Sequence, residues 1–212
     1  MYISNVIKFL KSFQKNNENR YRDYYELETI FTYEFLVKHN ILTRNKNILE
    51  IGCGGGIFYE EYKDYLVAQN NIYTCIDIDK TSIAISQKNC DYVKFICVDI
   101  NELSISELAK FDILLMVQVY ICIPNMKKII KKYLKSNPNG RIIIINTIVP
   151  KYLTGISNFG RTIINNLFDV NWGEALTLDK IHDFAEYIKK PISYEIIGTS
   201  PLSGHYEYLI TL

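Results

Sequence analysis

The sequence lacks a long block of charge of one sign, and its formal net charge is only +1 over 212 residues. A broad electrostatic surface for nucleic acid or anionic membrane is therefore not indicated. It also lacks a long apolar run: DILLMVQVYICIP and RIIIINTIVP fall short of the about 20 residues that span a bilayer. The N-terminus shows no signal-peptide pattern. We therefore expect a cytoplasmic protein with neither a membrane nor a nucleic-acid partner.

The cysteines lack the spacing of a metal site or a disulfide framework. Cys53, Cys75, Cys90, Cys97 and Cys122 share no CxxC motif, and most lie inside apolar runs. This pattern predicts reduced thiols that pack as small hydrophobic groups. A chain of this length buries about 70% of its unfolded surface without cross-links, so we expect one domain.

Short β-rich runs alternate with helical patterns from residue 45 onward, which is typical of βαβ units and a parallel sheet. The runs are continuously apolar, as expected of strands covered on both faces. We predict strands at 47–52, 72–78, 94–100, 111–118 and 141–148, and helices at 57–69, 80–89, 125–136 and 176–190. Two final strands, 192–200 and 205–212, lie so close together that one of them should run antiparallel.

The predicted helix 125–136 is strongly amphipathic. Its apolar residues repeat at helical spacing, so Lys127, Lys128, Lys131 and Lys132 share the opposite face. The simplest interpretation of this lysine cluster is a solvent-exposed helix face, and a binding patch is the alternative.

Four glycines fall within residues 52–56, directly after the first predicted strand. A glycine turn between a strand and a helix places backbone N–H groups at the carboxyl edge of the sheet, where ligands bind. A dinucleotide-binding turn follows G-x-G-x-x-G, but Ile57 stands where its last glycine should be. With Glu50 just before them, the bunched glycines favour an uncharged or cationic ligand over a pyrophosphate.

This stretch, ILEIGCGGG, resembles motif I of the class I S-adenosylmethionine (SAM) dependent methyltransferases. The similarity continues in order through YTCIDID, KFICVDI and FDILLMVQVYICIP, which resemble the family's second-, third- and fourth-strand motifs. It covers about residues 45–149, and the two closing strands fit the family's seven-stranded sheet. The resemblance implies a doubly wound α/β fold with a mostly parallel seven-stranded sheet, an antiparallel last strand and N-terminal helices. It also implies SAM as cofactor and S-adenosylhomocysteine (SAH) as product.

A single domain over 1–212 would then divide into four parts. These are an N-terminal helical cap (1–44), the SAM-binding core (45–149), a substrate-cap segment (150–176), and a closing helix with two strands (177–212).

The resemblance implies roles for individual residues. Glu50 would orient the glycine loop or meet the cationic amino acid part of SAM, although local pairing is the alternative. Asp77 would take both ribose hydroxyls, because a carboxylate can accept two hydrogen bonds at once. Asp99 would accept from the adenine amino group while the Ile100 amide reads the ring, although Asp also commonly ends strands. Asp79 competes for the ribose role but suits the N-cap of helix 80–89. The other expected cofactor contacts are Gly52, Cys53, Gly54, Gly56, Ile78 and Val117.

Methyl transfer from a sulfonium is an in-line displacement, so the protein mainly has to align donor and acceptor. A general base is needed only if the acceptor arrives protonated, and no metal is expected. His205, His182 and Tyr120 are the candidate catalytic residues, with proximity alone as the alternative. The acceptor should be an oxygen or nitrogen of a small molecule. Its expected binding residues are Tyr21, Tyr25, Tyr152, Arg161 and Trp172.

Other activities of the same fold are less favoured. The sequence Met116 to Tyr120 lacks the (Asp/Asn)-Pro-Pro-aromatic signature of methyltransferases that act on nucleic acid bases. An aminopropyl transferase would need an acidic cluster after the fourth strand. A non-catalytic SAM-binding subunit or sensor stays open, because its cofactor motifs would be identical. A monomer and a homodimer are equally compatible with the sequence.

Overall fold

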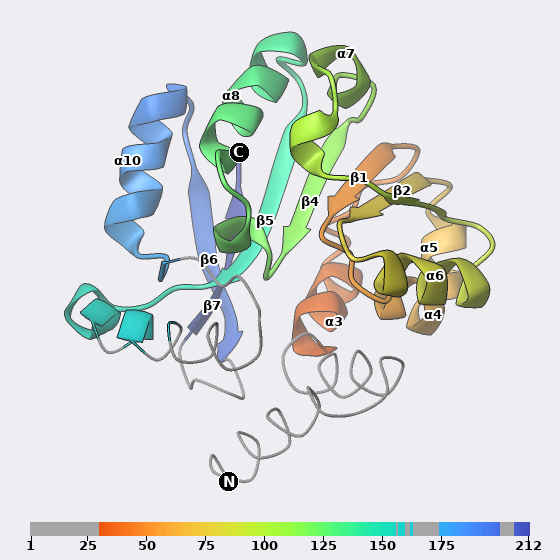
Figure 1. Ribbon diagram of the computed structural model, residues 1–212, viewed down its shortest axis with the longest axis horizontal. Helices are drawn as coiled ribbons and strands as arrows, with labels where there is room; N and C mark the ends of the chain where they lie inside the picture. Colours follow the sequence, from red (N-terminus) through yellow and green to blue (C-terminus); the bar gives the residue numbers. More distant parts are fainter. Residues whose placement is uncertain (1–29, 156, 160–161, 163–173, 200–205) are drawn as a thin grey trace, which may run out of the picture.

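A seven-stranded sheet with helices on both faces forms the frame of the molecule (Figure 1). The computed structural model describes residues 30–155, 157–159, 162, 174–199 and 206–212. The strands are β1 (Asn47–Ile51), β2 (Ile72–Asp77), β3 (Lys94–Cys97), β4 (Ile113–Val117), β5 (Arg141–Thr147), β6 (Ser193–Thr199) and β7 (Tyr206–Thr211). The α-helices are α3 (Ile30–Lys38), α4 (Ile57–Glu61), α5 (Lys63–Ala68), α6 (Lys80–Asn89), α7 (Ile105–Leu108), α8 (Met126–Ser136) and α10 (Leu178–Ile188). Short 3-10 helices are η2 (Ile100–Glu102), η3 (Tyr120–Cys122) and η4 (Lys151–Leu153).

The strand order is β3-β2-β1-β4-β5-β7-β6. The first five strands pair in parallel, whereas β7 runs antiparallel to both β5 and β6. The predicted doubly wound fold with an antiparallel last strand is therefore confirmed. Because β1 and β4 are neighbours while the chain leaves them toward opposite sides, the carboxyl ends of β1 and β4 flank the switch point where such folds bind ligands.

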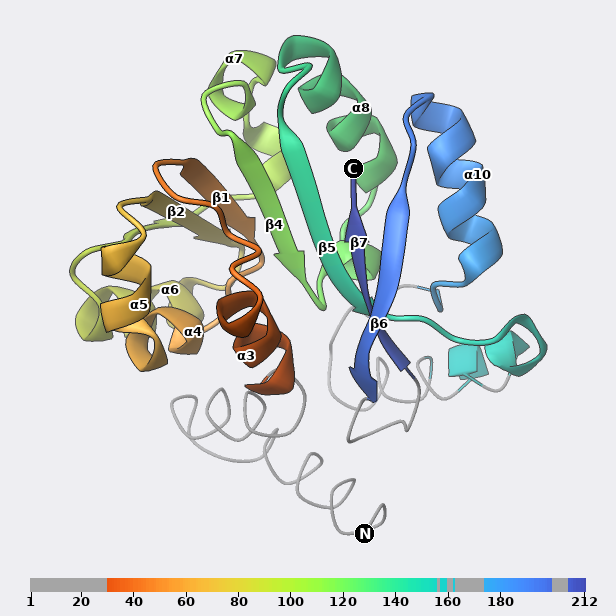
Figure 2. The ribbon, with the colours of Figure 1, turned by 180° about the vertical axis from the view of Figure 1, so that it is seen from behind.

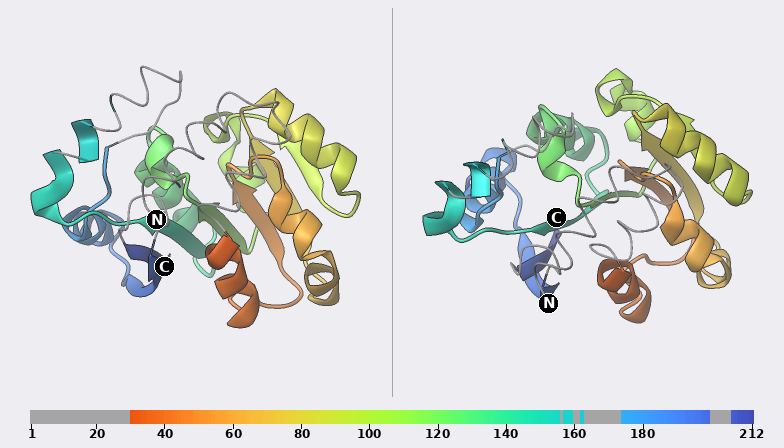
Figure 3. Two further views of the ribbon diagram at one scale, coloured as in Figure 1. Left: turned by 90° about the horizontal axis from the view of Figure 1, so that it is seen from below. Right: turned by 60° about the horizontal axis from the view of Figure 1, so that its bottom comes forward.

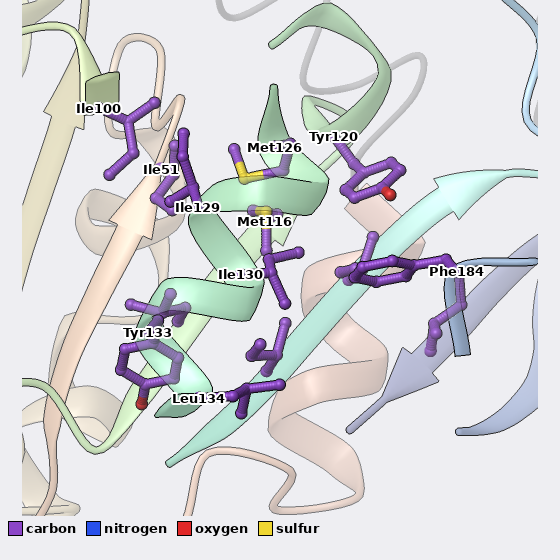
Figure 4. Packing of buried hydrophobic residues seen from close by; sticks show 14 of the residues in the cluster. Ile51, Ile100, Met116, Tyr120, Met126, Ile129, Ile130, Tyr133, Leu134 and Phe184 are labelled. Carbon is purple, nitrogen blue, oxygen red and sulfur yellow. The ribbon is translucent and has the colours of Figure 1, made fainter. Parts of the chain in front are cut away.

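Each face of the sheet packs on its own hydrophobic cluster, because side chains alternate along a strand. In β4, Ile113, Leu115 and Val117 join the cluster beneath α3, α4, α5 and α6. Of these helices, α3, α4 and α5 lie in front of the sheet in Figure 2. The intervening β4 residues join the cluster beneath α7, α8 and α10. Figure 4 shows this second cluster, with Met116 meeting Ile130.

Two predicted elements need correction. The helix expected over 57–69 breaks at Tyr62, whose φ of −111° and ψ of 25° lie outside the helical region. The sequence pattern hides this break, since Phe58, Tyr62 and Leu66 keep helical spacing across it. The strand expected over 94–100 ends at Cys97, because Asp99 turns the chain into η2. Among the described helices, none is both long and apolar enough to cross a membrane.

The glycine turn supplies a stability test. Gly54 and Gly56 both have left-handed φ values, of 54° and 69°. A Cβ on Gly56 would lie 2.8 Å from Ser86 Oγ and 3.1 Å from Phe95 Cε1, whereas one on Gly54 would meet nothing within 4 Å. We expect Gly54→Ala to lower the free energy of unfolding by about 1–2 kcal/mol through φ alone. Gly56→Ala should cost about 1–3 kcal/mol more through overpacking.

Urea denaturation of the two variants measures this difference directly. Gly54→Ala is the matched control, because it carries the same side chain in the same backbone region. If both variants lose the same free energy of unfolding, a Cβ atom at position 56 fits beside Ser86 and Phe95 without further cost.

Candidate functional site

The glycine turn after β1 is packed at both ends and open in the middle. Gly52 extends the sheet by donating its N–H to the Ile76 carbonyl at 2.7 Å. At its φ of 74°, a Cβ on Gly52 would lie 2.4 Å from Val119 Cγ2, so the loop after β4 presses on the turn. The space beside Gly54 is free to 4 Å. The turn is therefore accessible only in part, at Gly54, at the carboxyl edge of the sheet, which Figure 3 views from below.

Asp77, at the end of β2, holds this turn in place. Its Oδ2 accepts the Gly54 N–H at 2.8 Å, and its Oδ1 accepts the Asp79 N–H at 2.9 Å. Burial raises the pKa of this carboxyl, while the two N–H donors oppose that rise. A carboxylate has about four lone-pair sites, so two sites stay available for ligand hydroxyls.

Asp79 lies two residues after Asp77 and was the alternative candidate for binding the ribose. Asp79 caps α6, accepting from the Thr81 N–H at 2.9 Å and from the Ser82 hydroxyl at 2.6 Å. The N-cap prediction for Asp79 is therefore confirmed, and each of its oxygens accepts a hydrogen bond from the first turn of α6. Ile78 is 74% exposed, which leaves a large apolar side chain uncovered beside the turn.

Asp99 lies after β3, the next strand along the sheet. Its Oδ1 accepts from both the backbone N–H and the side-chain amide of Asn101 at 2.8 Å. It thus ends the strand and caps η2, as the alternative interpretation of this residue held. The Ile100 side chain is buried in the cluster beneath α8, so only its backbone could contact a ligand.

Glu50 is a fully buried acid in the middle of the sheet. Its Oε1 accepts from the Tyr33 hydroxyl at 3.0 Å, while its Oε2 has no hydrogen-bond partner among the described residues. Burial raises the pKa of Glu50 from its ordinary value of 4.5 to about 7, against the lowering effect of the Tyr59 and Tyr33 hydroxyls. Because an unpaired carboxylate in such a place is costly, this site is suited to a cationic partner.

These residues fit the expected cofactor. The unpartnered Glu50 Oε2 matches its cationic amino acid part, the free space at Gly54 admits close approach, and Asp77 retains capacity for two hydroxyls. Ile78 offers an apolar surface to a flat ring. The two other expected contacts, Cys53 and Val117, are buried at the ends of the turn and of β4.

The structure describes only some of the expected catalytic and acceptor-binding residues. Tyr120 is buried in η3, the short helix that follows β4. Its ring centroid lies 6.0 Å from that of Phe184 (Figure 4). His182 is exposed on α10, with its ring 6.0 Å from that of Tyr194 on β6. Tyr152 is 83% exposed in η4. The remaining residues of this set, Tyr21, Tyr25, Arg161, Trp172 and His205, lie outside the described residues.

Asn146 is a candidate that the sequence interpretation missed. It sits near the carboxyl end of β5 with 0% exposure, and neither atom of its amide head group has a hydrogen-bond partner in the part of the chain that the structure describes. By strand alternation it shares the face of Ile144, beneath α8 and α10. The sequence did carry a sign of this residue, because an asparagine follows four consecutive isoleucines in the run RIIIINTI.

A family model described as a methyltransferase domain matches residues 42–187. Among curated relatives, a ubiquinone biosynthesis O-methyltransferase from Coxiella burnetii is 24% identical over 160 residues, or 72% of this chain. The chain spans 62% of that relative's length. A protein of the same name from Idiomarina loihiensis is 25% identical over 129 residues, which cover 58% of this chain and 51% of the relative.

Solved structures share the fold. The plantazolicin methyltransferase BpumL, in complex with a pentazolic desmethylPZN analog and SAH, has a TM-score of 0.63 at 20% identity over 99% of each chain. YcgJ from Bacillus subtilis has a TM-score of 0.61 at 11% identity over 85% and 96% of the two chains. Magnesium protoporphyrin IX methyltransferase from Synechocystis PCC 6803, with bound SAM, has a TM-score of 0.55 at 15% identity over 85% and 75%.

Glu50 predicts a pH dependence of stability. Its pKa is higher in the folded chain than in the unfolded chain, so the folded state binds more protons between about pH 4.5 and pH 7. Stability from this group is complete below pH 4.5 and is lost as the pH rises through 7. The loss amounts to about 3 kcal/mol. We expect Glu50→Gln to remove this part of the slope when unfolding is measured without ligand from pH 5 to pH 8.

The exposed Glu186→Gln on α10 is the matched control and should keep the wild-type slope. A constant difference between wild type and Glu50→Gln across this pH range would show that Glu50 does not titrate there.

Asn146 predicts a gain of stability on losing its polar group. Replacing it with Leu removes a buried donor and a buried acceptor that are unpaired, each of which costs about 1–3 kcal/mol. We expect Asn146→Leu to raise the melting temperature. Asn137→Leu is the control, because Asn137 Nδ2 donates to the Phe111 carbonyl at 2.8 Å and its loss should lower that temperature. A fall in both variants would mean that Asn146 is satisfied in solution.

Proposed function

Because this chain belongs to the class I SAM-dependent methyltransferase family, we propose that it transfers a methyl group to an oxygen or nitrogen atom of a small-molecule acceptor. The observation that carries this proposal is the cradle made by the open glycine turn, Asp77 and the unpartnered Glu50 oxygen at the switch point of the sheet. The relatives named as O-methyltransferases support oxygen as the first choice of acceptor atom.

Bound SAM would supply a methyl group already activated on a sulfonium. In the transfer, the methyl carbon bonds to the acceptor oxygen as its bond to sulfur breaks, and the hydroxyl proton passes to solvent. The protein's part is alignment, which can contribute as much as about 7–11 kcal/mol. In this proposal Asp77 fixes the ribose through its two remaining lone-pair sites, and Glu50 holds the cationic end. Asp99 keeps one oxygen for the adenine amino group.

The acceptor would bind next to the loop after β4. Val119 in this loop touches the glycine turn, which supports a position for the acceptor beside Tyr120. Burial raises the pKa of the Tyr120 hydroxyl far above its usual value, so this group would donate a hydrogen bond and would not act as a base. Proximity catalysis therefore suits the described residues better than general-base catalysis does.

Calorimetric titration with SAM, SAH and NAD tests this proposal. We expect saturable binding of SAM and SAH and none of NAD. Asp77→Ala should weaken SAM binding by more than about 100-fold, because it removes two hydrogen bonds to a charged group, which contribute about 1.5–3 kcal/mol each. Asp91→Ala is the matched control, since it removes an exposed carboxylate paired with Lys63 at 3.1 Å.

Binding of NAD without SAM or SAH would contradict the proposal. Release of SAH from SAM in the presence of a metabolite mixture, followed by mass spectrometry, separates an enzyme from a SAM-binding subunit without turnover.

A further inference from the structure

A groove of about 440 Å³ lies between the first turns of α8, the loop before it and α10. This volume falls within the range of small-molecule sites, about 300–1,000 Å³. Four of its lining residues are apolar: Ile121, Ile123, Met126 and Leu176. Such walls suit the body of an apolar or aromatic compound. The residues of the proposed SAM site, Glu50, Gly54 and Asp77, do not line this groove.

The groove carries an excess of positive charge. Lys127 and Lys128 line it, and both are exposed and make no ion pair with any described residue. The one acid in its lining, Glu174, is paired with Lys180 Nζ at 2.9 Å, and that lysine also donates to the Ala175 carbonyl. Two ammonium groups therefore stand uncompensated beside an apolar surface.

The inner end of the groove holds an unpartnered polar group. Tyr120 lines the groove at 8% exposure, and its hydroxyl makes no hydrogen bond within the described part of the chain. The next residue back along the chain, Val119, touches Gly52 of the turn. Because this hydroxyl is not fully enclosed, a ligand in the groove can reach it and accept its hydrogen bond. The groove thus leads from exposed lysines to an unpaired donor beside the cofactor turn.

Resting on the function proposed above, we propose that this groove binds the methyl acceptor and that the acceptor is an amphipathic anion. Its carboxylate or phosphate would pair with Lys127 and Lys128, its apolar body would cover the walls, and a hydroxyl would accept from Tyr120. Two ammonium groups disfavour a cationic acceptor such as a polyamine, because like charges repel. The lysine cluster thus divides into two residues that line the groove and others that do not, such as Lys131, whose ammonium group is engaged by the Tyr187 carbonyl.

A pair of probes that differ only in charge tests this inference. They are 3-(4-hydroxyphenyl)propionate and its neutral amide, titrated by calorimetry into SAH-saturated protein at about 0.15 M salt, where surface charges are screened. We expect the acid to bind at least tenfold more tightly than the amide. Lys127→Ala/Lys128→Ala should abolish that preference, and Tyr120→Phe should weaken both probes by a similar factor.

Lys132→Ala/Lys135→Ala is the matched control, since it removes the same charge from the same helix outside the groove. It should keep the preference for the acid. Equal affinity for acid and amide, no binding of the acid at millimolar concentration, or an equal loss in the control would each overturn the inference. SAH titration of the same proteins separates the two proposals. If SAH binds and the acid does not, only the groove assignment fails; if SAH itself does not bind, the proposed function fails.

Discussion

The carboxylate of Asp77 ties together the two strands on which the candidate site depends. By accepting N–H groups from Gly54 and Asp79, it fixes the turn after β1 against the turn after β2. The backbone bond from the Gly52 N–H to the Ile76 carbonyl links the start of the first turn to β2, and the Asp77 carboxylate adds a second link at Gly54. A single side chain thus sets the separation of two loops and still offers lone pairs to a ligand. Gly54 suits this contact, because its left-handed φ of 54° would cost free energy in a residue with a Cβ atom.

A few buried polar groups lack hydrogen-bond partners within the described part of the chain, and each of them lowers the stability of the fold. Among the described residues, Glu50 has one unpaired buried atom and Asn146 has two, and Thr32 and Tyr59 each add an unpaired hydroxyl. Natural cores satisfy most such groups. Glu50 and Asn146 lie near the carboxyl ends of β1 and β5, on opposite faces of the sheet. Under the proposed function, a cationic group of the ligand would fill the hydrogen-bonding capacity left at Glu50.

Much of the fold could be predicted from the sequence, because nearly continuous apolar runs such as RIIIINTI indicate strands that are buried on both faces. The turn and its acids were also visible, since their spacing follows from chain connectivity. The break at Tyr62 was not, because Phe58, Tyr62 and Leu66 keep one periodicity through it. The groove between α8 and α10 could not be predicted either, since it depends on which residues of two helices far apart in the chain come to face each other.

The contact between Val119 and Gly52 links the loop beside the proposed acceptor groove to the turn of the proposed cofactor site. In evolutionary terms, it limits how a new acceptor preference can arise in this chain. Residues such as Ile121 and Ile123 can change in size without touching the turn, whereas a bulkier residue at 119 would displace the backbone that holds the cofactor. Divergence of specificity should therefore proceed by substitutions along the groove, while position 119 stays small and the two binding functions remain separable under selection.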